Sequence, residues 1–483
     1  MLNKANELSV YPVPEKVAVN SDFSVRVRCG GGEWEKLSAY NVKVDMHDVR
    51  NASMVYFDFS GTVEVEVVKN TGTVESVMIR PLSFGVRHRQ EGNKITFTLN
   101  KPGKLSLEVN GDRFHNLHIF AGSPVKNTPD PEASNVLYLK PGIHRPQEIL
   151  KAISSKNLIT GREPEIIYFA PGMHYIEELI LSIPSGKTVY IPGGAAVVGS
   201  IVCDHVQDVT IRGRGVLYLI NVERSSYFRG FRIIFSRNIR IEGIVVIDPP
   251  HYSIFIGQSE EVTIKDFKAF SCYGWSDGID CMSSSKIDID DVFMRNSDDC
   301  IAIYGHRWEF NGDSRNITVK NSVLWADVAH PTLIGTHGDH ENNGNVLEDI
   351  TFENIDILEH HEPQPNYLGC MAINAGDKNT VRHVRYENIR VEQFENGRLF
   401  DIRVFKNPDY NPAPGTRIEN IHFKDIFYNG IGEHPSRIMG YDDDRVVQDV
   451  TVENLRINGK IILDEKSGNI DIGESVYGVV FKR

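Results

Sequence analysis

Three aspartates stand in two short segments that have the features of a catalytic site. Asp277 lies in Gly274-Trp-Ser-Asp-Gly-Ile-Asp280, and Asp298 and Asp299 lie in Asn296-Ser-Asp-Asp-Cys-Ile-Ala-Ile303. Carboxyl groups held close together cannot all ionise freely, so one pKa rises while another stays low. Hydrolysis of a glycosidic bond requires such an acid and such a base at one site. We therefore predict that all three aspartates are catalytic.

The spacing of these aspartates is typical of a solenoid. Asp277 and Asp298 are 21 residues apart, roughly one coil, so we expect one to lie above the other with Asp299 beside both. Neighbouring strand residues point to opposite faces, so Asp298 and Asp299 can share a site only where the chain bends. Ser297 favours a bend there. An Asp-Asp pair alone is usually a solvated turn, but the coil spacing and Gly278 favour a site.

A degenerate repeat supplies the elements that would position these side chains. An apolar–polar alternation ending in a polar pair recurs at intervals of about 23 to 37 residues, without helical periodicity. The phrase begins at Val209, Ile239, Val262, Ile287, Ile317, Ile350, Val384, Ile421 and Val450. It predicts a right-handed parallel β-helix of about 9–11 coils. Leucine-rich repeats fit less well because their consensus is missing, and a propeller needs longer antiparallel blades.

The remaining chain completes an all-β prediction. Residues 1–125 alternate in polarity with frequent turns, which predicts an N-terminal antiparallel β-sandwich domain. We expect a linker at 126–136 and the β-helix catalytic domain at 137–483. An amphipathic helix within 145–155 is expected to cap the open end of the solenoid.

Composition limits the partners. The net charge of −13 argues against nucleic-acid binding, and no apolar run is long enough to span a membrane. The chain shows no signal peptide, so a cytoplasmic location is expected as given, and a secreted or periplasmic one if a signal was removed. Six scattered cysteines form no CxxC pair, so we expect buried thiols and no metal site. Oligomeric state stays open.

The motifs resemble those of the polygalacturonase-like glycoside hydrolases of family 28. Trp275-Ser-Asp-Gly-Ile-Asp280 resembles their Asn-Thr-Asp-Gly-x-Asp motif, and Ser297-Asp-Asp-Cys-Ile-Ala-Ile303 resembles Gly-Asp-Asp-Cys-x-Ala. Ala329-His-Pro-Thr-Leu-Ile-Gly-Thr-His-Gly338 resembles Gly-His-Gly-x-Ser-x-Gly-Ser, and Asp248-Pro-Pro-His-Tyr-Ser-Ile254 is similar to a Ser-Pro-x-Trp phrase one coil earlier. The resemblance covers about residues 137–460. It implies a pectin-lyase-like β-helix.

The resemblance also implies roles. Asp298 is expected to be the general acid, Asp277 and Asp299 to activate water, and His330 to support the acid. The implied reaction inverts the anomeric carbon without a metal or cofactor. The substrate would be an oligo- or polysaccharide with α-linked bonds.

One departure from the family concerns the carboxylate-binding Arg-x-Lys pair. Ala372 and Asn374 stand at the matching positions, and a neutral amide suits sugar hydroxyls better than a carboxylate. The chain is also similar to the dextranase and isopullulanase group (family 49), which joins a sandwich to a β-helix and attacks neutral α-glucans. We place it in the clan that the two families share.

Further substrate-binding candidates surround the aspartates. Rings can stack on sugar faces, and loop cations or imidazoles can bind hydroxyl groups. These candidates are Trp275, Tyr304, His306, Arg307, His337 and Asn374. The segment Glu359-His-His-Glu362 could suggest a metal, but a solvated loop is the favoured interpretation because no further ligand pattern accompanies it.

Two other functions stay open. A polysaccharide lyase can share this fold, although no basic Arg or Lys accompanies the aspartates. A non-catalytic glycan-binding β-helix is the third hypothesis. Sugar identity, linkage, and endo or exo action do not follow from the sequence.

Overall fold

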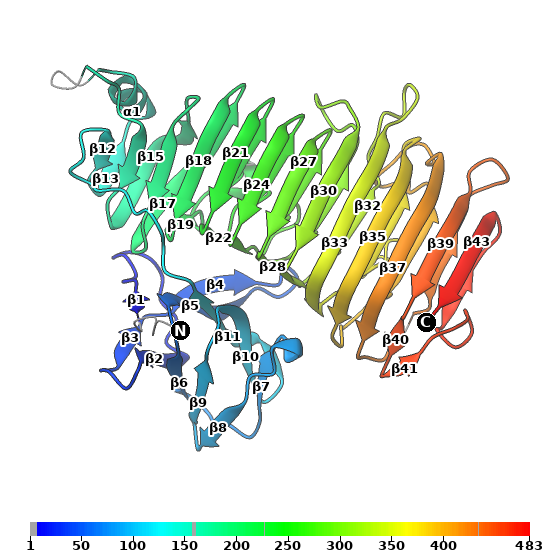
Figure 1. Cartoon of the computed structure of the whole chain (residues 1–483), viewed down its shortest axis with the longest axis horizontal. Coiled ribbons are helices and arrows are strands. Elements are labelled where there is room, and N and C mark those ends of the chain that lie inside the picture. Colours follow the sequence, from blue (N-terminus) through cyan, green and yellow to red (C-terminus); the bar gives the residue numbers. More distant parts are fainter. Residues whose placement is uncertain (1–6, 157–160, 227, 433) are drawn as a thin grey trace, which may run out of the picture.

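The computed structural model describes residues 7–156, 161–226, 228–432 and 434–483, and it is built almost wholly of strands. Figure 1 shows a long solenoid with a smaller β-rich body packed against its flank. Strands between residues 8 and 122 form the smaller body, and strands between residues 136 and 482 form the solenoid. The predicted fold class is confirmed. The boundaries 1–125, 126–136 and 137–483 stay a prediction.

Two sheets face each other in the smaller body, here called the sandwich, around an apolar core that includes Val27, Phe57, Val65 and Leu107. The first sheet contains β1 (Leu8–Val10), β4 (Tyr40–Val44), β5 (Arg50–Phe59), β7 (Val77–Arg80), β10 (Gly103–Val109) and β11 (Asp112–Gly122). The second contains β2 (Phe23–Cys29), β3 (Glu35–Leu37), β6 (Val63–Lys69), β8 (His88–Glu91) and β9 (Lys94–Leu99). The pairings are antiparallel except that β11 runs parallel to β5.

One face of the solenoid carries the repeat phrase. Its strands are β12 (Val136–Leu139), β14 (Ile166–Phe169), β16 (Thr188–Ile191), β18 (Gln207–Gly213), β21 (Arg237–Glu242), β24 (Glu260–Lys265), β27 (Ser285–Asp290), β30 (Ser314–Lys320), β33 (Val346–Glu359), β35 (Thr380–Val391), β37 (Arg417–Tyr428), β39 (Val447–Glu453) and β43 (Val476–Lys482). These thirteen strands exceed the expected nine to eleven coils, because β12, β14, β16 and β43 lack the phrase.

The first residues of the nine phrases lie in direct register. Val209 pairs with Ile239, Ile239 with Val262, and the series continues unbroken to Ile421 and Val450. Each side chain therefore stacks on its equivalent in the next coil and fills one continuous interior. An Asn or Asp with positive φ often ends the phrase, as Asn321 and Asn354 do, which turns the chain toward the next face.

Two further faces close each coil. The second includes β13 (Gly142–His144), β15 (Gly172–Ser182), β17 (Ala195–Asp204), β19 (Val216–Tyr218), β22 (Val245–Ile247), β25 (Lys268–Phe270), β28 (Phe293–Asn296), β31 (Val323–Ala326) and β40 (Arg456–Ile457), which pairs with β41 (Lys460–Ile461). The third includes β20 (Phe231–Ile234), β23 (Ile254–Gly257), β26 (Ile279–Met282), β29 (Ile301–Tyr304), β32 (Thr332–Gly335), β34 (Met371–Ala375), β36 (Phe400–Val404), β38 (Ser436–Met439) and β42 (Ile470–Ile472).

The predicted cap is α1 (Pro146–Ile153), which buries Ile149 and Ile153 against the first coils. Short 3₁₀ turns lie at Leu82–Phe84 and Arg224–Ser226. The cysteines are free thiols, and all but Cys29 are buried. Among the described residues, no helix has the length and apolar character needed to cross a membrane.

The sandwich covers the second face of the solenoid. Val42, Met54 and Phe120 pack with Phe270, Phe293 and Trp325, which point outward from that face. Buried ion pairs cross the same interface: Arg214 contacts Asp58, and Arg80 contacts Glu392. Such pairs become costly when one partner is removed, so they fix the orientation of the two bodies. The turns that follow β25 and β28 carry the predicted catalytic residues.

Candidate active site

The predicted aspartates lie in the turns between the second and third faces. Asp277 lies two residues before β26, and Asp298 and Asp299 lie in a bend between β28 and β29. One carboxylate oxygen from each of the three lies within 4.8 Å of the other two. Asp277 and Asp299 are both 4% exposed, and Asp298 is partly exposed. The structure thus brings all three together and supplies the expected bend.

The stacking differs from the expectation by one residue. Ile279 pairs with Ile301, and the N–H of Gly278 donates to the carbonyl oxygen of Asp299 at 2.8 Å. Asp277 therefore stacks on Asp299, and not on Asp298 as the 21-residue spacing had implied. A Cβ at Gly278 would lie 2.2 Å from the carbonyl oxygen of Cys300, so this close approach requires glycine.

Asp298 is held by the backbone. The N–H of Trp275, a residue with φ of 63°, donates to Asp298 Oδ2 at 2.6 Å, and the N–H of Asp299 donates to Asp298 Oδ1 at 3.1 Å. Burial and the adjacent Asp299 charge raise the pKa of Asp298 to about 7, although the two N–H groups lower it. A carboxylic acid that keeps its proton near neutral pH is suited to act as a general acid.

Asp299 faces cationic and hydroxyl donors. His330 is fully buried, and its Nδ1 lies 2.6 Å from Asp299 Oδ1, while Tyr304 donates its hydroxyl to Asp299 Oδ2 at 3.3 Å. Burial lowers the pKa of His330, but the Asp299 carboxylate outweighs burial and raises that pKa to about 9. The ring is thus an imidazolium at neutral pH and holds a positive charge against the Asp299 carboxyl group. His330 contacts Asp299, whereas the family resemblance had implied support of the acid Asp298.

Asp280 is a fourth carboxyl group that the sequence analysis did not select. It is fully buried, its charge acts on that of Asp277, and its register neighbours are Phe255 and Ala302. Burial and nearby aspartates raise the pKa values of both Asp277 and Asp280 well above the ordinary range. Neighbouring carboxyl groups titrate together, so ionising one of them raises the pKa of the other. Its position in the segment Trp275–Asp280 could have indicated from the sequence that Asp280 belongs to the site.

The aspartates open into a cleft of about 1010 Å³. Four of the six predicted substrate-binding residues line it: Trp275, Tyr304, Arg307 and His337. Residues that were not predicted also line it, namely Met46, His47, Val49, Arg224, Tyr252, Tyr273, Glu362, Gln364, Tyr367 and Tyr410. Trp275 is 52% exposed and offers a ring for a sugar face.

Two predicted substrate-binding residues lie elsewhere. Asn374 is fully buried and is not among the residues that line the cleft. His306 follows the turn after β29, and its N–H donates to Asn345 Oδ1 at 2.9 Å outside the cleft lining. The structure therefore does not bring these two residues to the cleft, because the register and the course of the loops, which the motif spacing does not reveal, decide where a side chain lies.

The segment Glu359–Glu362 is not the solvated loop that was expected. Glu359, His360 and Glu362 are 4% exposed or less. Glu359 contacts Arg113 of the sandwich, and His360 Nδ1 lies 2.8 Å from the carbonyl oxygen of Ala329. Glu362 lines the cleft behind His330, and burial raises its pKa.

Arg307 is a cation that lines this cleft. Its Nη1 donates to the hydroxyl of Tyr252 at 2.9 Å, and its guanidinium lies 5.4 Å and 4.7 Å from the ring centres of Tyr304 and Trp308. Its charge lowers the pKa values of Asp277 and Asp280, against the burial that raises them. Arg307 therefore limits how many protons the acidic cluster holds.

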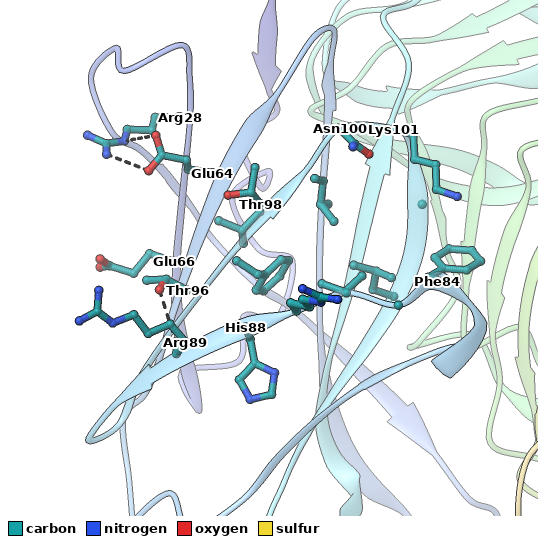
Figure 2. A pocket seen from close by; sticks show the side chains of 18 of the residues that line it. Arg28, Glu64, Glu66, Phe84, His88, Arg89, Thr96, Thr98, Asn100 and Lys101 are labelled. Atoms are coloured by element: carbon teal, nitrogen blue, oxygen red, sulfur yellow. Dashed lines mark hydrogen bonds and ion pairs between the residues drawn. The ribbon is translucent and has the colours of Figure 1, made fainter.

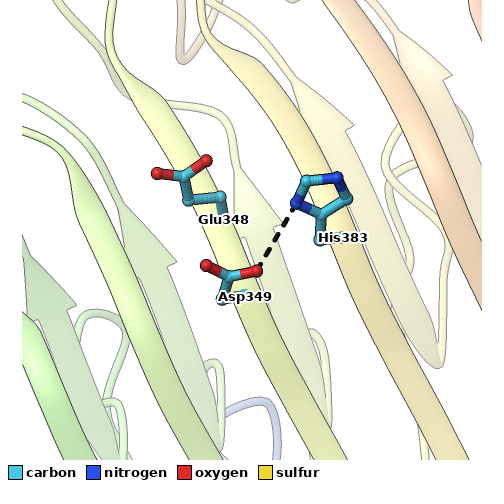
Figure 3. A group of neighbouring side chains, drawn as sticks. All are labelled: Glu348, Asp349 and His383. Atoms are coloured by element: carbon cyan, nitrogen blue, oxygen red, sulfur yellow. Dashed lines mark ion pairs between the residues drawn. The ribbon is translucent and has the colours of Figure 1, made fainter.

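Two other features of the surface differ from this site. A hollow of about 800 Å³ on the sandwich contains Phe84, His88, Arg89 and Lys101, and Figure 2 shows its Arg28 already paired with Glu64. It holds no cluster of carboxyl groups. Glu348, Asp349 and His383 gather on the outer surface of β33 and β35 (Figure 3), where Glu348 is paired with Arg382 at 2.6 Å. We interpret both as charged surface.

The three catalytic candidates could also hold a metal ion, since their oxygens lie within one coordination sphere. A bound cation would keep all three carboxyl groups ionised. It would thereby remove the protonated acid that Asp298 otherwise provides.

Comparison with known proteins agrees with the motifs. Residues 228–467 match the model of glycosyl hydrolases family 28. A probable endopolygalacturonase D of Neosartorya fischeri is 28% identical over 154 residues, which cover 31% of this chain and 29% of that protein. A polygalacturonase of Juniperus ashei is 24% identical over 199 residues, which cover 40% of this chain and 36% of that protein. The chain thus spans about a third of these relatives.

Solved structures share the fold. Dex49A from Penicillium minioluteum aligns with a TM-score of 0.58 at 15% identity, covering 98% of this chain and 96% of that one. The polygalacturonase from Erwinia carotovora ssp. carotovora aligns with a TM-score of 0.50 at 16% identity, covering 75% of this chain and 100% of that one. The class that fold and site define is the parallel β-helix with an acidic cleft. The resemblance to the polygalacturonase-like and dextranase-like clan is confirmed.

Proposed function

We propose that this chain is an inverting glycoside hydrolase that cleaves α-linked glycosidic bonds in oligo- or polysaccharides. The observation that carries the proposal is the approach of Asp277, Asp298 and Asp299 to within 4.8 Å in one cleft, in surroundings that give them different protonation states. The match to glycosyl hydrolases family 28 supports it.

In the proposed reaction, Asp298 is the general acid. Its carboxyl group keeps a proton near neutral pH and gives it to the glycosidic oxygen as the bond to the anomeric carbon breaks. The backbone N–H groups of Trp275 and Asp299 donate hydrogen bonds to Asp298 and stabilise the carboxylate that proton transfer leaves behind. The negative charge that forms on Asp298 when it gives up its proton is therefore already hydrogen-bonded.

Asp299 and Asp277 are the proposed base. Oxygens up to about 5.5 Å apart can both accept hydrogen bonds from one water molecule, so the 4.8 Å limit allows a bridging water. This separation is shorter than the roughly 6.5–9.5 Å between carboxyl groups that is usual for inverting hydrolases. In the proposed mechanism the bridging water lies on the face opposite the leaving group, and Asp299, which contacts His330, takes its proton.

A panel of pectic and α-glucan oligosaccharides tests the proposal through release of reducing ends. We expect the parent protein to cleave at least one α-linked glycan, and Asp298→Asn to lose about 10²–10⁴-fold in kcat. Asp443→Asn is the matched control, since Asp443 is exposed and lies outside the cleft lining. No release from any glycan, or release of unsaturated ultraviolet-absorbing products by elimination, would contradict hydrolysis.

A further inference from the structure

The sandwich reaches the cleft through the turn between β4 and β5, residues 45–49, here called the β4–β5 turn. Figure 1 shows β4 running along the flank of the solenoid toward β28, the strand that leads to the catalytic bend. Met46, His47 and Val49 line the same cleft as Asp277 and Asp298. We propose that the β4–β5 turn is part of the active site, where it holds the catalytic bend and forms a glycan-binding wall. This inference rests on the proposed hydrolase function.

The turn is bonded to the residue that precedes the general acid. The N–H of Met46 donates to Ser297 Oγ at 3.1 Å, and Ser297 is fully buried next to Asp298. The N–H of Asp45 donates to Asp327 Oδ2 at 3.3 Å. Two backbone N–H groups of the sandwich thus donate hydrogen bonds to side chains of the solenoid beside the bend.

Asp327 links this contact to the strand that carries the bend. Arg295 of β28 contacts both oxygens of Asp327 at 3.0–3.2 Å, and neither side chain is exposed. The same guanidinium donates to Asn116 Oδ1 at 2.9 Å in β11 of the sandwich. Arg295 is three residues before Asp298. The sandwich therefore contacts the strand that leads to the catalytic bend twice, through Asp327 and through Asn116.

The turn is itself rigid. Asp45 has φ of 59°, and its Oδ1 accepts the N–H of His47 at 3.0 Å. Arg50 forms an ion pair with Asp45 and lies 3.3 Å from the centre of the Phe114 ring. A turn fixed in this way presents its outer side chains in one arrangement, which reduces the entropy lost on binding.

Those outer side chains suit a sugar. Val49 is 50% exposed and His47 is exposed, and the ring centre of His47 lies 6.0 Å from that of His361 across the cleft rim. An apolar side chain beside an imidazole offers one surface for the C–H face of a pyranose and one partner for its hydroxyls. The expected ligand is a glycan residue outside the bond that is cleaved.

Steady-state kinetics on oligosaccharides of increasing length test the wall. Val49→Trp is expected to lower kcat/KM at least about threefold on long substrates, and less on the shortest one cleaved, because only a long chain reaches the turn. The control is Val19→Trp, since Val19 is 61% exposed on the sandwich and outside the cleft lining. His47→Ala provides a second variant if Val49→Trp does not fold.

Ser297→Ala tests the positioning role. We expect kcat to fall about tenfold or more with KM unchanged, together with a shifted alkaline limb of the pH profile, because Asp298 loses its fixed place. Ser322→Ala is the matched control: Ser322 is also buried and accepts a backbone N–H, that of Val292, at 3.1 Å, but lies away from the cleft. Its kinetics should equal those of the parent.

The outcomes separate the two proposals. If the parent cleaves glycans while the Val49, His47 and Ser297 variants behave as their controls do, the role of the turn is overturned and the hydrolase function stands. If the parent cleaves none, both are overturned. Loss on long substrates with Val49→Trp, together with a kcat loss confined to Ser297→Ala, would support the inference.

Discussion

Replacing the general acid should stabilise the protein while it abolishes catalysis. Burial and the Asp299 charge raise the pKa of Asp298 from an ordinary 3.8 to about 7. Since one pKa unit corresponds to about 1.4 kcal/mol, ionising Asp298 in the folded protein costs about 4 kcal/mol. Stability from the raised folded-state pKa is fully present below about pH 4 and is lost as the pH rises through about 7.

Asp298→Asn removes that ionisation. The amide oxygen can accept one of the N–H groups of Trp275 and Asp299, and loss of the other acceptor costs about 1 kcal/mol. The variant should therefore be more stable than the parent by about 3 kcal/mol at about pH 8, and within about 1 kcal/mol of it at about pH 4. Thermal unfolding of both proteins across this pH range measures the difference.

Two control variants show whether a gain in stability is specific to Asp298→Asn. Asp299→Asn leaves the buried His330 imidazolium without its carboxylate, so it should destabilise the protein by about 3–5 kcal/mol. Asp48→Asn changes a side chain that is 79% exposed and should shift stability by less than about 0.5 kcal/mol. An Asp298→Asn variant that is destabilised equally at pH 4 and pH 8 would refute the assignment of a raised pKa to Asp298.

Three further predictions concern the charges around the cluster. His330→Gln removes the buried partner of Asp299, so kcat/KM should fall about tenfold; a variant as active as the parent would count against a role for the ion pair. Arg307→Gln removes the charge that lowers the pKa values of Asp277 and Asp280, so activity should fall most at acid pH, which kcat/KM measured across pH would detect. Dialysis against EDTA should leave activity unchanged, because the mechanism uses a protonated acid; loss that added metal restores would disprove this.

The solenoid could be predicted because its sequence signal is local and repeated. A β-branched alternation such as the one at Ile287 fills the interior in every coil, and the predicted phrase starts are register partners. The predicted stacking of the catalytic aspartates was displaced by one residue, because the spacing of two residues along the chain does not give the register between two coils. The register pairs Ile279 with Ile301, which sets Asp277 on Asp299.

The parts of the site that sequence reasoning missed depend on contacts between distant segments. The β4–β5 turn lies more than two hundred residues from Asp277, and nothing local in Met46 or Val49 indicates a cleft. Asn374 was selected by alignment with a family motif, but its side chain is fully buried, which the motif does not reveal. Asp280 differs, since it stood inside a quoted motif and period-two alternation could have identified it.

The configuration of the first product tests the central claim most directly. Proton NMR of an α-linked oligosaccharide during early turnover reports the anomer before mutarotation mixes the signals. The inverting mechanism predicts a β-configured product, formed by the parent and not by Asp298→Asn, because a water held by Asp277 and Asp299 attacks opposite the leaving group. An α-configured first product would show that one of these carboxylates acts as a nucleophile and would contradict the proposed mechanism.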